Sequence, residues 1–235
     1  MIFNENTIRG KMTFFNNVYS SVSKKIGRYY PLVLLVPVNF ILSFPRVFSF
    51  VNQVMRGSKG IQRYASECIR AKDGDKVLDI GCGPENALQY LPDVDYCGFD
   101  LDPTYIKVAK ARYPTRGKFY CKKVSSDAIK GEGSFDIIIS VGVIHHLNDD
   151  EARQLFALAY HLLKPGGRLV THDGCYRPGQ SWIERFFLDI DRGRHIRTET
   201  EYRKLVCSGF TSVSVDIRLD LLLIPQSTIV FTCTR

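Results

Sequence analysis

The stretch "KVLDIGCGPEN", residues 76–86, joins a short apolar run to two glycines and carries an acid, Asp79, inside that run. An apolar run of this length is typical of a strand that is buried in a parallel sheet. Gly81 and Gly83 permit a tight turn and a close approach of the backbone to a ligand. In a doubly wound sheet, the turn after the first strand lies at the carboxyl edge, where ligands bind. The stretch therefore predicts the first strand of such a sheet, followed by a ligand-binding turn.

Strand and helix patterns alternate from residue 61 onward with short connections. We expect strands at residues 76–80, 95–100, 117–124, 135–141, 168–173, 210–219 and 227–234. We expect helices at residues 61–71, 84–91, 103–113, 149–163 and 199–209. The alternation predicts an α/β fold with a doubly wound, mostly parallel, seven-stranded sheet. Because the link between the last two strands is too short for a parallel crossover, these two strands should pair antiparallel at one edge of the sheet, which makes the last strand antiparallel.

The composition sets the domain count and the compartment. The chain has 235 residues, of which 45% are hydrophobic, enough for one large core with an appendage. We place this domain at residues 56–235 and a helical, apolar N-terminal extension at residues 1–55. Seven cysteines without a CxxC pair argue against a metal site or a disulfide framework, and the chain does not begin with a secretory signal pattern. We therefore expect a cytoplasmic protein with reduced thiols and no metal.

Two interpretations of the N-terminal extension stay open. Residues 29–51 are strongly apolar, but prolines and Arg46 interrupt them, and their longest apolar run is shorter than the roughly 20 residues that a spanning helix needs. Residues 14–26 place apolar side chains at helical spacing, with Lys24 and Lys25 near the end. The extension either folds over the domain as an arm or lid, or makes peripheral contact with an anionic membrane through residues 14–51. The net charge of +8 is compatible with both.

The residues around the glycine turn favour a positively charged ligand. A dinucleotide site would have a third glycine where this chain has Asn86, and no acids near its diphosphate. Asp79 and Glu85 would repel a diphosphate and attract an ammonium or sulfonium group. Asp100 ends the second strand nineteen residues after Gly81, where a carboxylate can accept both hydroxyls of a ribose. The pattern predicts an adenosine with a cationic tail, which describes S-adenosylmethionine.

Four successive motifs carry a resemblance to a known family. Over residues 56–235 the chain resembles the class I S-adenosylmethionine-dependent methyltransferases, with "VLDIGCGP", "GFDLDP", "FDIIISVGVIHHL" and "LLKPGGRLVTHD" in the order of that family. The resemblance implies a Rossmann-like fold, S-adenosylmethionine as cofactor and S-adenosylhomocysteine as product. It implies cofactor contacts from the glycine turn, from the ends of the second and fourth strands and from the segment after the third: Asp79, Gly81, Cys82, Gly83, Asp100, Leu101, Lys123, Val124 and Val141.

One of these positions departs from the family pattern. Where the family often has an acid that contacts the adenine amino group, this chain has Lys123. Asp127 is near enough in sequence to replace that acid, or the backbone around Val124 binds the adenine instead.

Methyl transfer from a sulfonium requires alignment of the acceptor and exclusion of water, so that a catalytic base is optional. His145 and His146 follow the fourth strand beside the expected methyl donor, and either is a candidate to accept a proton. The alternative is that one of them caps or packs the following helix. His172 and Asp173 end the fifth strand and raise the same two alternatives.

The connection of residues 173–202, named here the cap segment, is long for its place in the fold, and long connections at this edge are often functional. We expect it to face the acceptor, with Tyr176 and Trp182 as apolar contacts and with Arg194 and Arg197 binding an acidic group. The alternative is that its arginines pair with acids of the same segment, such as Glu184 and Glu199.

These features favour an S-adenosylmethionine-dependent methyltransferase that acts on a small-molecule acceptor. A membrane-associated lipid or quinone methyltransferase, a non-catalytic S-adenosylmethionine-binding protein and a nicotinamide enzyme are the alternatives. We expect no nucleic-acid partner, because the sequence shows no RNA-binding module and no Asn/Asp-Pro-Pro-aromatic motif after the fourth strand.

Overall fold

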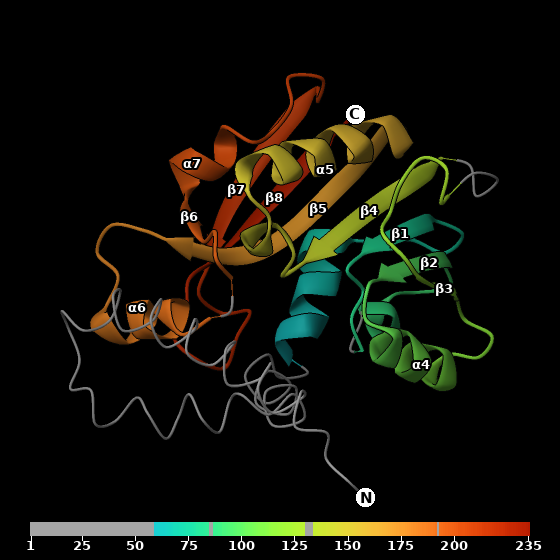
Figure 1. Cartoon of the computed structure of the whole chain (residues 1–235), viewed down its shortest axis with the longest axis horizontal. Coiled ribbons are helices and arrows are strands. Elements are labelled where there is room, and N and C mark those ends of the chain that lie inside the picture. The colour runs from blue at the N-terminus through green and yellow to red at the C-terminus, as the bar shows by residue number, and fades with distance from the viewer. Residues whose placement is uncertain (1–58, 85–86, 130–133, 192) are drawn as a thin grey trace, which may run out of the picture. The chain divides into compact units, whose positions relative to one another are not determined.

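The structure is a computed structural model that describes residues 59–84, 87–129, 134–191 and 193–235 (Figure 1). The predictions on residues 1–55, including the membrane contact through residues 14–51, and those on Glu85 and Asn86 lie outside the described residues. The chain forms two compact units, of which the larger contains residues 56–188 and 192–235. Within the described ranges, no helix combines the length and apolar character that crossing a membrane requires.

A mixed sheet with the strand order β3-β2-β1-β4-β5-β8-β7 forms the centre of the fold. Its strands are β1 Lys76–Ile80, β2 Asp95–Asp100, β3 Lys118–Cys121, β4 Phe135–Val141, β5 Leu163–Tyr176, β7 Ser212–Arg218 and β8 Thr228–Thr234. The first five strands pair in parallel, and β8 runs antiparallel to both β5 and β7. The doubly wound, mostly parallel, seven-stranded sheet and its antiparallel last strand are confirmed. A short additional strand, β6 Arg197–Thr198, pairs in parallel with β5 and was not predicted.

Helices cover both faces of this sheet (Figure 1). One buried apolar cluster contains side chains of α5 Asp149–Leu162 and α7 Glu199–Arg203. The other cluster contains side chains of the helix η1 Tyr64–Ile69 and of α4 Pro103–Arg112. The central strand β4 lies between the clusters, and its residues Ile137, Ile138 and Ile139 are fully buried, as its apolar sequence predicted. A further helix, α6 Trp182–Asp189, lies in the cap segment.

Hydrogen-bonding side chains define the starts of three helices. Asp102 accepts a hydrogen bond from the backbone N–H of Thr104, with Pro103 in the first turn of α4, as expected for an N-cap. Asn148 and Glu151 form a reciprocal capping box at the start of α5, and Thr198 and Glu201 form another at α7.

Two predicted helices are shorter in the structure than in the sequence pattern. The helix expected at residues 84–91 is, in its described part, a single 3₁₀ turn, η2 Ala87–Tyr90. Pro92 follows two residues after Tyr90 and disfavours helical geometry at Leu91, the residue before it. The helix expected at residues 199–209 ends at Arg203, and the amides of Leu205 and Val206 then bond to carbonyls three residues back, which is the tighter geometry of a 3₁₀ turn.

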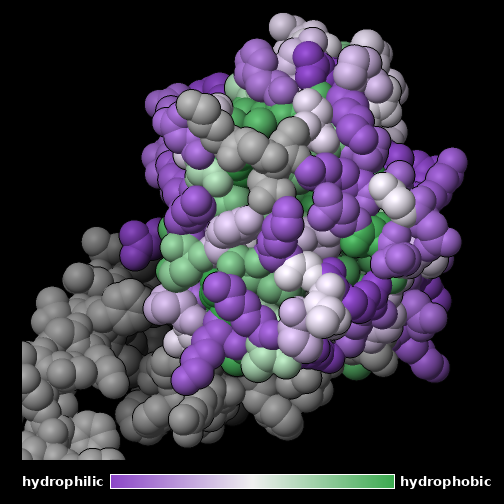
Figure 2. All heavy atoms as spheres, turned by 90° about the vertical axis from the view of Figure 1, so that its right-hand side faces the viewer, coloured by the Kyte–Doolittle hydropathy of each residue, from purple (hydrophilic) through white to green (hydrophobic). Residues whose placement is uncertain are grey.

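The parallel arrangement brings four strand ends to one edge. β1 ends before Gly81, β2 ends at Asp100, β4 ends at Val141, and β5 passes this point at His172. The backbone N–H of Gly142 donates to the carbonyl of His172 at 2.7 Å, which joins the turn after β4 to β5. On the side of the molecule shown in Figure 2, the described residues present mostly hydrophilic side chains with hydrophobic surface between them, and apolar atoms are a normal part of a protein surface.

Candidate functional site

The glycine turn after β1 is held against β2. The N–H groups of Gly81 and Cys82 donate to the carbonyl of Phe99 at 2.8 and 2.9 Å. Gly81 has a φ of +74° and Gly83 a φ of +57°, a region that side chains disfavour. A Cβ on Gly81 would lie 2.4 Å from Cγ2 of Val143, whereas a Cβ on Gly83 would meet no atom of the described residues within 4 Å. Gly81 is thus required by packing within the protein, and Gly83 leaves open space beside the turn.

Asp100 joins the glycine turn to the end of β2. Its Oδ2 accepts a hydrogen bond from the N–H of Gly83 at 3.0 Å, and its Oδ1 accepts one from the N–H of Asp102 at 2.9 Å. Each carboxylate oxygen can accept a further hydrogen bond. The carboxylate is therefore held in one orientation with capacity for two ribose hydroxyls.

Asp79 is a buried acid beside the same turn, only 2% exposed. The hydroxyl of Tyr96 on β2 donates to its Oδ2 at 2.5 Å. Burial, followed by the charge of Asp79, raises the pKa of Tyr96, so that Tyr96 stays a neutral donor. Burial and the charges of Asp79 and Asp100 likewise raise the pKa of the Cys82 thiol. Cys82 is thus an uncharged thiol rather than a nucleophile, and the field around the turn is negative.

The predicted adenine contacts differ in exposure. Leu101 is 71% exposed directly after β2, and Val124 is buried. Lys123 and Asp127 are both exposed on the segment after β3. Val141, the predicted contact on the methionine side, is half-buried at the end of β4. The adenine assignments and Val141 stay predictions.

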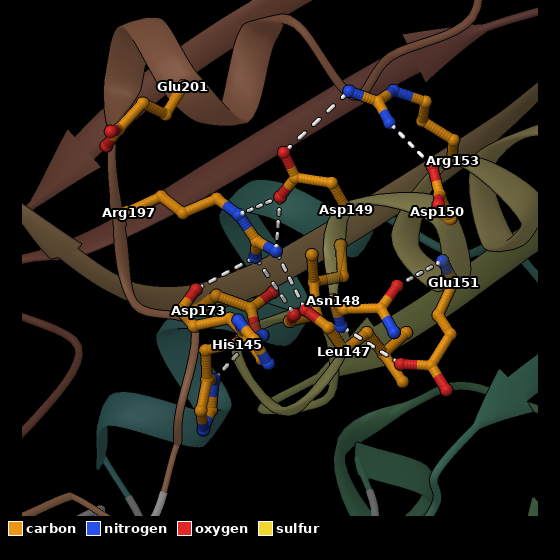
Figure 3. Close-up of polar contacts among 12 residues, drawn as sticks. His145, Leu147, Asn148, Asp149, Asp150, Glu151, Arg153, Asp173, Arg197 and Glu201 are labelled. Carbon is orange, nitrogen blue, oxygen red and sulfur yellow. Dashed lines mark hydrogen bonds and ion pairs between the residues drawn. The ribbon is translucent and has the colours of Figure 1, made fainter.

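The histidine turn, defined here as residues 143–148, follows β4 and contains the 3₁₀ helix η3 Ile144–His146 (Figure 3). His145 is 7% exposed, and both its N–H and its ring Nδ1 contact Oδ1 of Asp173, at 3.1 and 2.8 Å. His146 is exposed, and its ring centroid lies 4.2 Å from that of His145. The two candidates therefore differ: Asp173 orients His145, and His146 faces outward.

His172 and Asp173, adjacent residues of β5, contact different parts of the structure. Asp173 is 2% exposed and contacts the histidine turn, and its Oδ2 has no hydrogen-bond partner among the described residues. His172 instead packs edge-on against Tyr64 of η1, with ring centroids 5.2 Å apart. Because successive side chains of a strand point to opposite faces, Asp173 contacts His145 and His172 points away from it.

The cap segment is fastened to the sheet by a polar network. Arg177 donates to Oγ of Ser227 at 2.9 Å and to Oε2 of Glu184 at 3.0 Å. Ser227 in turn donates to the same Glu184 oxygen at 2.8 Å. Glu184 lies on α6 and Ser227 directly precedes β8, so that the network ties α6 to the sheet. The pairing of cap arginines with cap acids is confirmed for Arg177 and Glu184.

We expect this network to make stability depend on acid pH. Burial alone would raise the pKa of Glu184, but the hydrogen bond from Ser227 and the charge of Arg177 outweigh burial and lower that pKa. A carboxylate with a lowered pKa contributes stability above its unfolded pKa of about 4.3 and loses it as the pH falls through the folded value. Urea unfolding should therefore show the wild type about 1 kcal/mol more stable than Glu184→Gln at pH 7, with a smaller difference at pH 3. A difference that is equal at both pH values would contradict this account.

The predicted acceptor residues occupy different environments. Tyr176 is half-buried with the Arg185 guanidinium 5.6 Å from its ring centroid. Trp182 is 68% exposed at the start of α6, and Arg194 is exposed. These three stay predicted acceptor contacts.

Arg197 requires a correction. It is 6% exposed, and its guanidinium donates five hydrogen bonds to the carbonyls of Ile144, Leu147 and His195 and to Asp149. A guanidinium has five N–H donors, so that none is left for an acceptor. The basic side chain in a long connection suggested a ligand contact, and the long-range partners that bury it could not be inferred from the sequence. We therefore reassign Arg197 from acceptor binding to the support of the histidine turn.

Comparison with known proteins agrees with this geometry. A family model described as "Methyltransferase domain" matches residues 77–167. The chain is 31% identical over 186 residues to phosphoethanolamine N-methyltransferase 1 of Triticum aestivum, a match that covers 77% of this chain and 37% of the relative. Residues 77–167 thus match a methyltransferase domain, and the chain is similar to the class I S-adenosylmethionine-dependent methyltransferases. The resemblance inferred from the four motifs is thereby confirmed.

Other proteins match smaller parts of the chain or match by fold. Malonyl-[acyl-carrier protein] O-methyltransferase of Hahella chejuensis is 26% identical over 149 residues, covering 58% of this chain and 51% of the relative. The cyclopropane synthase MmaA2 of Mycobacterium tuberculosis superposes with a TM-score of 0.56 at 17% identity, covering 74% of this chain and 82% of that structure. The chain spans little more than a third of the length of the first curated relatives.

Proposed function

We propose that the protein binds S-adenosylmethionine at the carboxyl edge of β1 and β2 and transfers the methyl group to a small-molecule acceptor. The observation that carries the proposal is the glycine turn: Gly83 leaves open space beside a carboxylate, Asp100, that the backbone holds in a fixed orientation. A ribose fits such a carboxylate, because two adjacent hydroxyls can each donate to one of its oxygens.

The charge around the turn supports the same ligand. Asp79 is buried beside Cys82, and Asp100 is close enough that both acids raise the pKa of that thiol. A negative field in a poorly solvated site stabilises a sulfonium or ammonium group and disfavours a diphosphate. This contrast makes a nicotinamide dinucleotide a poor fit for these residues.

Bound S-adenosylmethionine supplies an electrophilic methyl group. The chain then has to orient the acceptor, exclude water and accept any proton that the acceptor loses. His145 is suited to the last task, because Asp173 fixes its ring through Nδ1, which sets the ring orientation as a carboxylate does in other histidine bases. His146 lies next to it with greater exposure and is the second candidate.

Relatives support a small acceptor. Two of them are named for phosphoethanolamine and for a malonyl group on an acyl-carrier protein. Peripheral membrane contact through residues 14–51 is a separate proposal, which flotation with anionic vesicles, with and without residues 1–55, tests.

A thermal-shift experiment tests the proposed cofactor. At a hundredfold excess over Kd, a ligand of the folded state adds about 2.7 kcal/mol of stability, which for a chain of this size raises Tm by about 5–10 °C. We expect this rise with S-adenosylmethionine and S-adenosylhomocysteine, and no rise with NAD. A rise with NAD alone would refute the proposal. Incubation with labelled donor and a fractionated small-molecule extract then identifies the fraction that gains the methyl group.

A further inference from the structure

Arg197 joins two segments that are far apart in the sequence. It belongs to β6, which pairs with β5 through Cys175, and its guanidinium lies against the histidine turn (Figure 3). Nη1 donates to the carbonyl of Ile144 at 3.3 Å, and Nη2 donates to the carbonyl of Leu147 at 2.8 Å. These two carbonyls lie on either side of His145 and His146. One buried side chain thus holds both ends of the turn that carries the candidate bases.

The same guanidinium also fixes the returning end of the cap segment, residues 193–198. Nη1 donates to the carbonyl of His195 at 2.8 Å, and the N–H of His195 donates to the carbonyl of His145 at 2.9 Å. The cap end and the histidine turn are therefore bonded to each other directly and through Arg197. A shift of one segment breaks contacts of the other.

Asp149 completes the arrangement from the first turn of α5. Its Oδ1 accepts from Nε and Nη2 of Arg197 at 3.0 and 2.8 Å, which supplies a counter-charge to the buried cation. The ring of Tyr202 lies 5.7 Å from the guanidinium carbon on another side. Only a planar group with five donors can serve these partners together, and a lysine ammonium has three.

We propose that Arg197 is a positioning residue that sets the histidine turn and the returning end of the cap segment in one fixed arrangement. The inference rests on the proposed function in one respect: the arrangement places His145 and His146 relative to an acceptor held under the cap segment. Arg197 acts through the turn and contacts neither donor nor acceptor. Its loss should slow methyl transfer and leave donor binding intact.

Amide hydrogen exchange tests the positioning without an acceptor. In Arg197→Met we expect the amides of His145 and His195 to exchange about tenfold faster or more, because local opening of the turn loses its restraint. The amides of β1 and β2 should keep their protection. Arg203→Met is the matched control, since Arg203 is an exposed arginine whose one ion-pair partner among the described residues is Glu199, across one turn of α7. Unchanged exchange at His145 and His195 in Arg197→Met would overturn the inference.

Methyl transfer tests the consequence. The assay uses labelled S-adenosylmethionine with the extract fraction that the wild type labels, and calorimetry with S-adenosylhomocysteine runs in parallel. We expect Arg197→Met to lower kcat by about thirtyfold, with Arg197→Lys recovering part of the loss, and both variants to keep the wild-type Kd within about twofold. Unchanged kcat, or an equal loss of kcat and of S-adenosylhomocysteine affinity, contradicts a positioning role.

Two further outcomes are separable. If Arg197→Met does not fold, Arg197→Lys retains the buried charge and undergoes the same measurements, with an intermediate effect expected. If the wild type does not bind S-adenosylhomocysteine, the proposed function fails, and the exchange of the His145 and His195 amides alone decides the positioning role.

Discussion

Replacing Gly81 by alanine is expected to lower the free energy of unfolding by about 3 kcal/mol. Two penalties add at this position. An L-residue with a positive φ costs about 1–2 kcal/mol, and the φ of Gly81 is +74°. The new Cβ would also lie 2.4 Å from Cγ2 of Val143, and such overpacking typically costs about 1–3 kcal/mol. Urea unfolding of the purified variants measures the sum.

Two companion variants separate these penalties. Gly74 has a φ of +81° with nothing within 4 Å of the position of its Cβ, so that Gly74→Ala carries the backbone penalty alone, about 1 kcal/mol. Val143→Ala removes the methyl group that Cβ of residue 81 would meet. The pair Gly81→Ala and Val143→Ala should therefore show a favourable coupling energy of about 1 kcal/mol or more in a double-mutant cycle. Equal losses for Gly81→Ala and Gly74→Ala would show that Val143 does not restrict the turn.

Replacing Asp100 by asparagine is expected to weaken S-adenosylhomocysteine binding by about a hundredfold. A hydrogen bond to a charged group contributes about 1.5–3 kcal/mol, and the amide can accept on one side only. The change also replaces one acceptor of the Gly83 or Asp102 N–H by an NH₂ group. Titration calorimetry with S-adenosylhomocysteine gives the affinity directly.

Asp102→Asn is the control for this change. It lies two residues further on, and its side chain caps α4 through Thr104, a task that asparagine performs equally well. We expect its affinity to stay within about threefold of the wild type. A loss in Asp100→Asn that is no larger than in Asp102→Asn would remove Asp100 from the ribose site.

The strands could be predicted from the sequence because a strand that is buried in the sheet is a run of apolar residues. The run around Ile138 predicted the central strand, and the fully buried Ile137–Ile139 confirm it. The glycine turn was equally readable, since only glycine adopts the backbone geometry of Gly81 and Gly83 without strain. In both cases the signal is local in the chain.

Contacts between distant segments were not readable. The hydroxyl of Tyr96 donates a hydrogen bond to Asp79, but a tyrosine in an apolar strand does not indicate which residue its hydroxyl will bond. Gly98 pairs with Asp79 across β1 and β2, and a Cβ there would lie 3.0 Å from Cys82, Tyr96 and Phe119. The partners of the ion pair between Arg197 and Asp149 are 48 residues apart in the sequence. The strand β6 has only two residues, too few to show the alternation of apolar and polar side chains that identifies a strand. Each depends on the assembled fold.

The fastening of the cap segment has an evolutionary consequence. Arg177 binds Ser227 and Glu184 near the beginning of the segment, and Arg197 binds the histidine turn near its end. Asp100 and Gly83, by contrast, belong to the opposite half of the sheet, on β2 and beside β1. Substitutions between Arg177 and Arg197 can therefore accumulate without disturbing Asp100 and Gly83, the proposed ribose site. Descendants of this chain can then diverge in the acceptor that they bind and keep the same way of binding the donor.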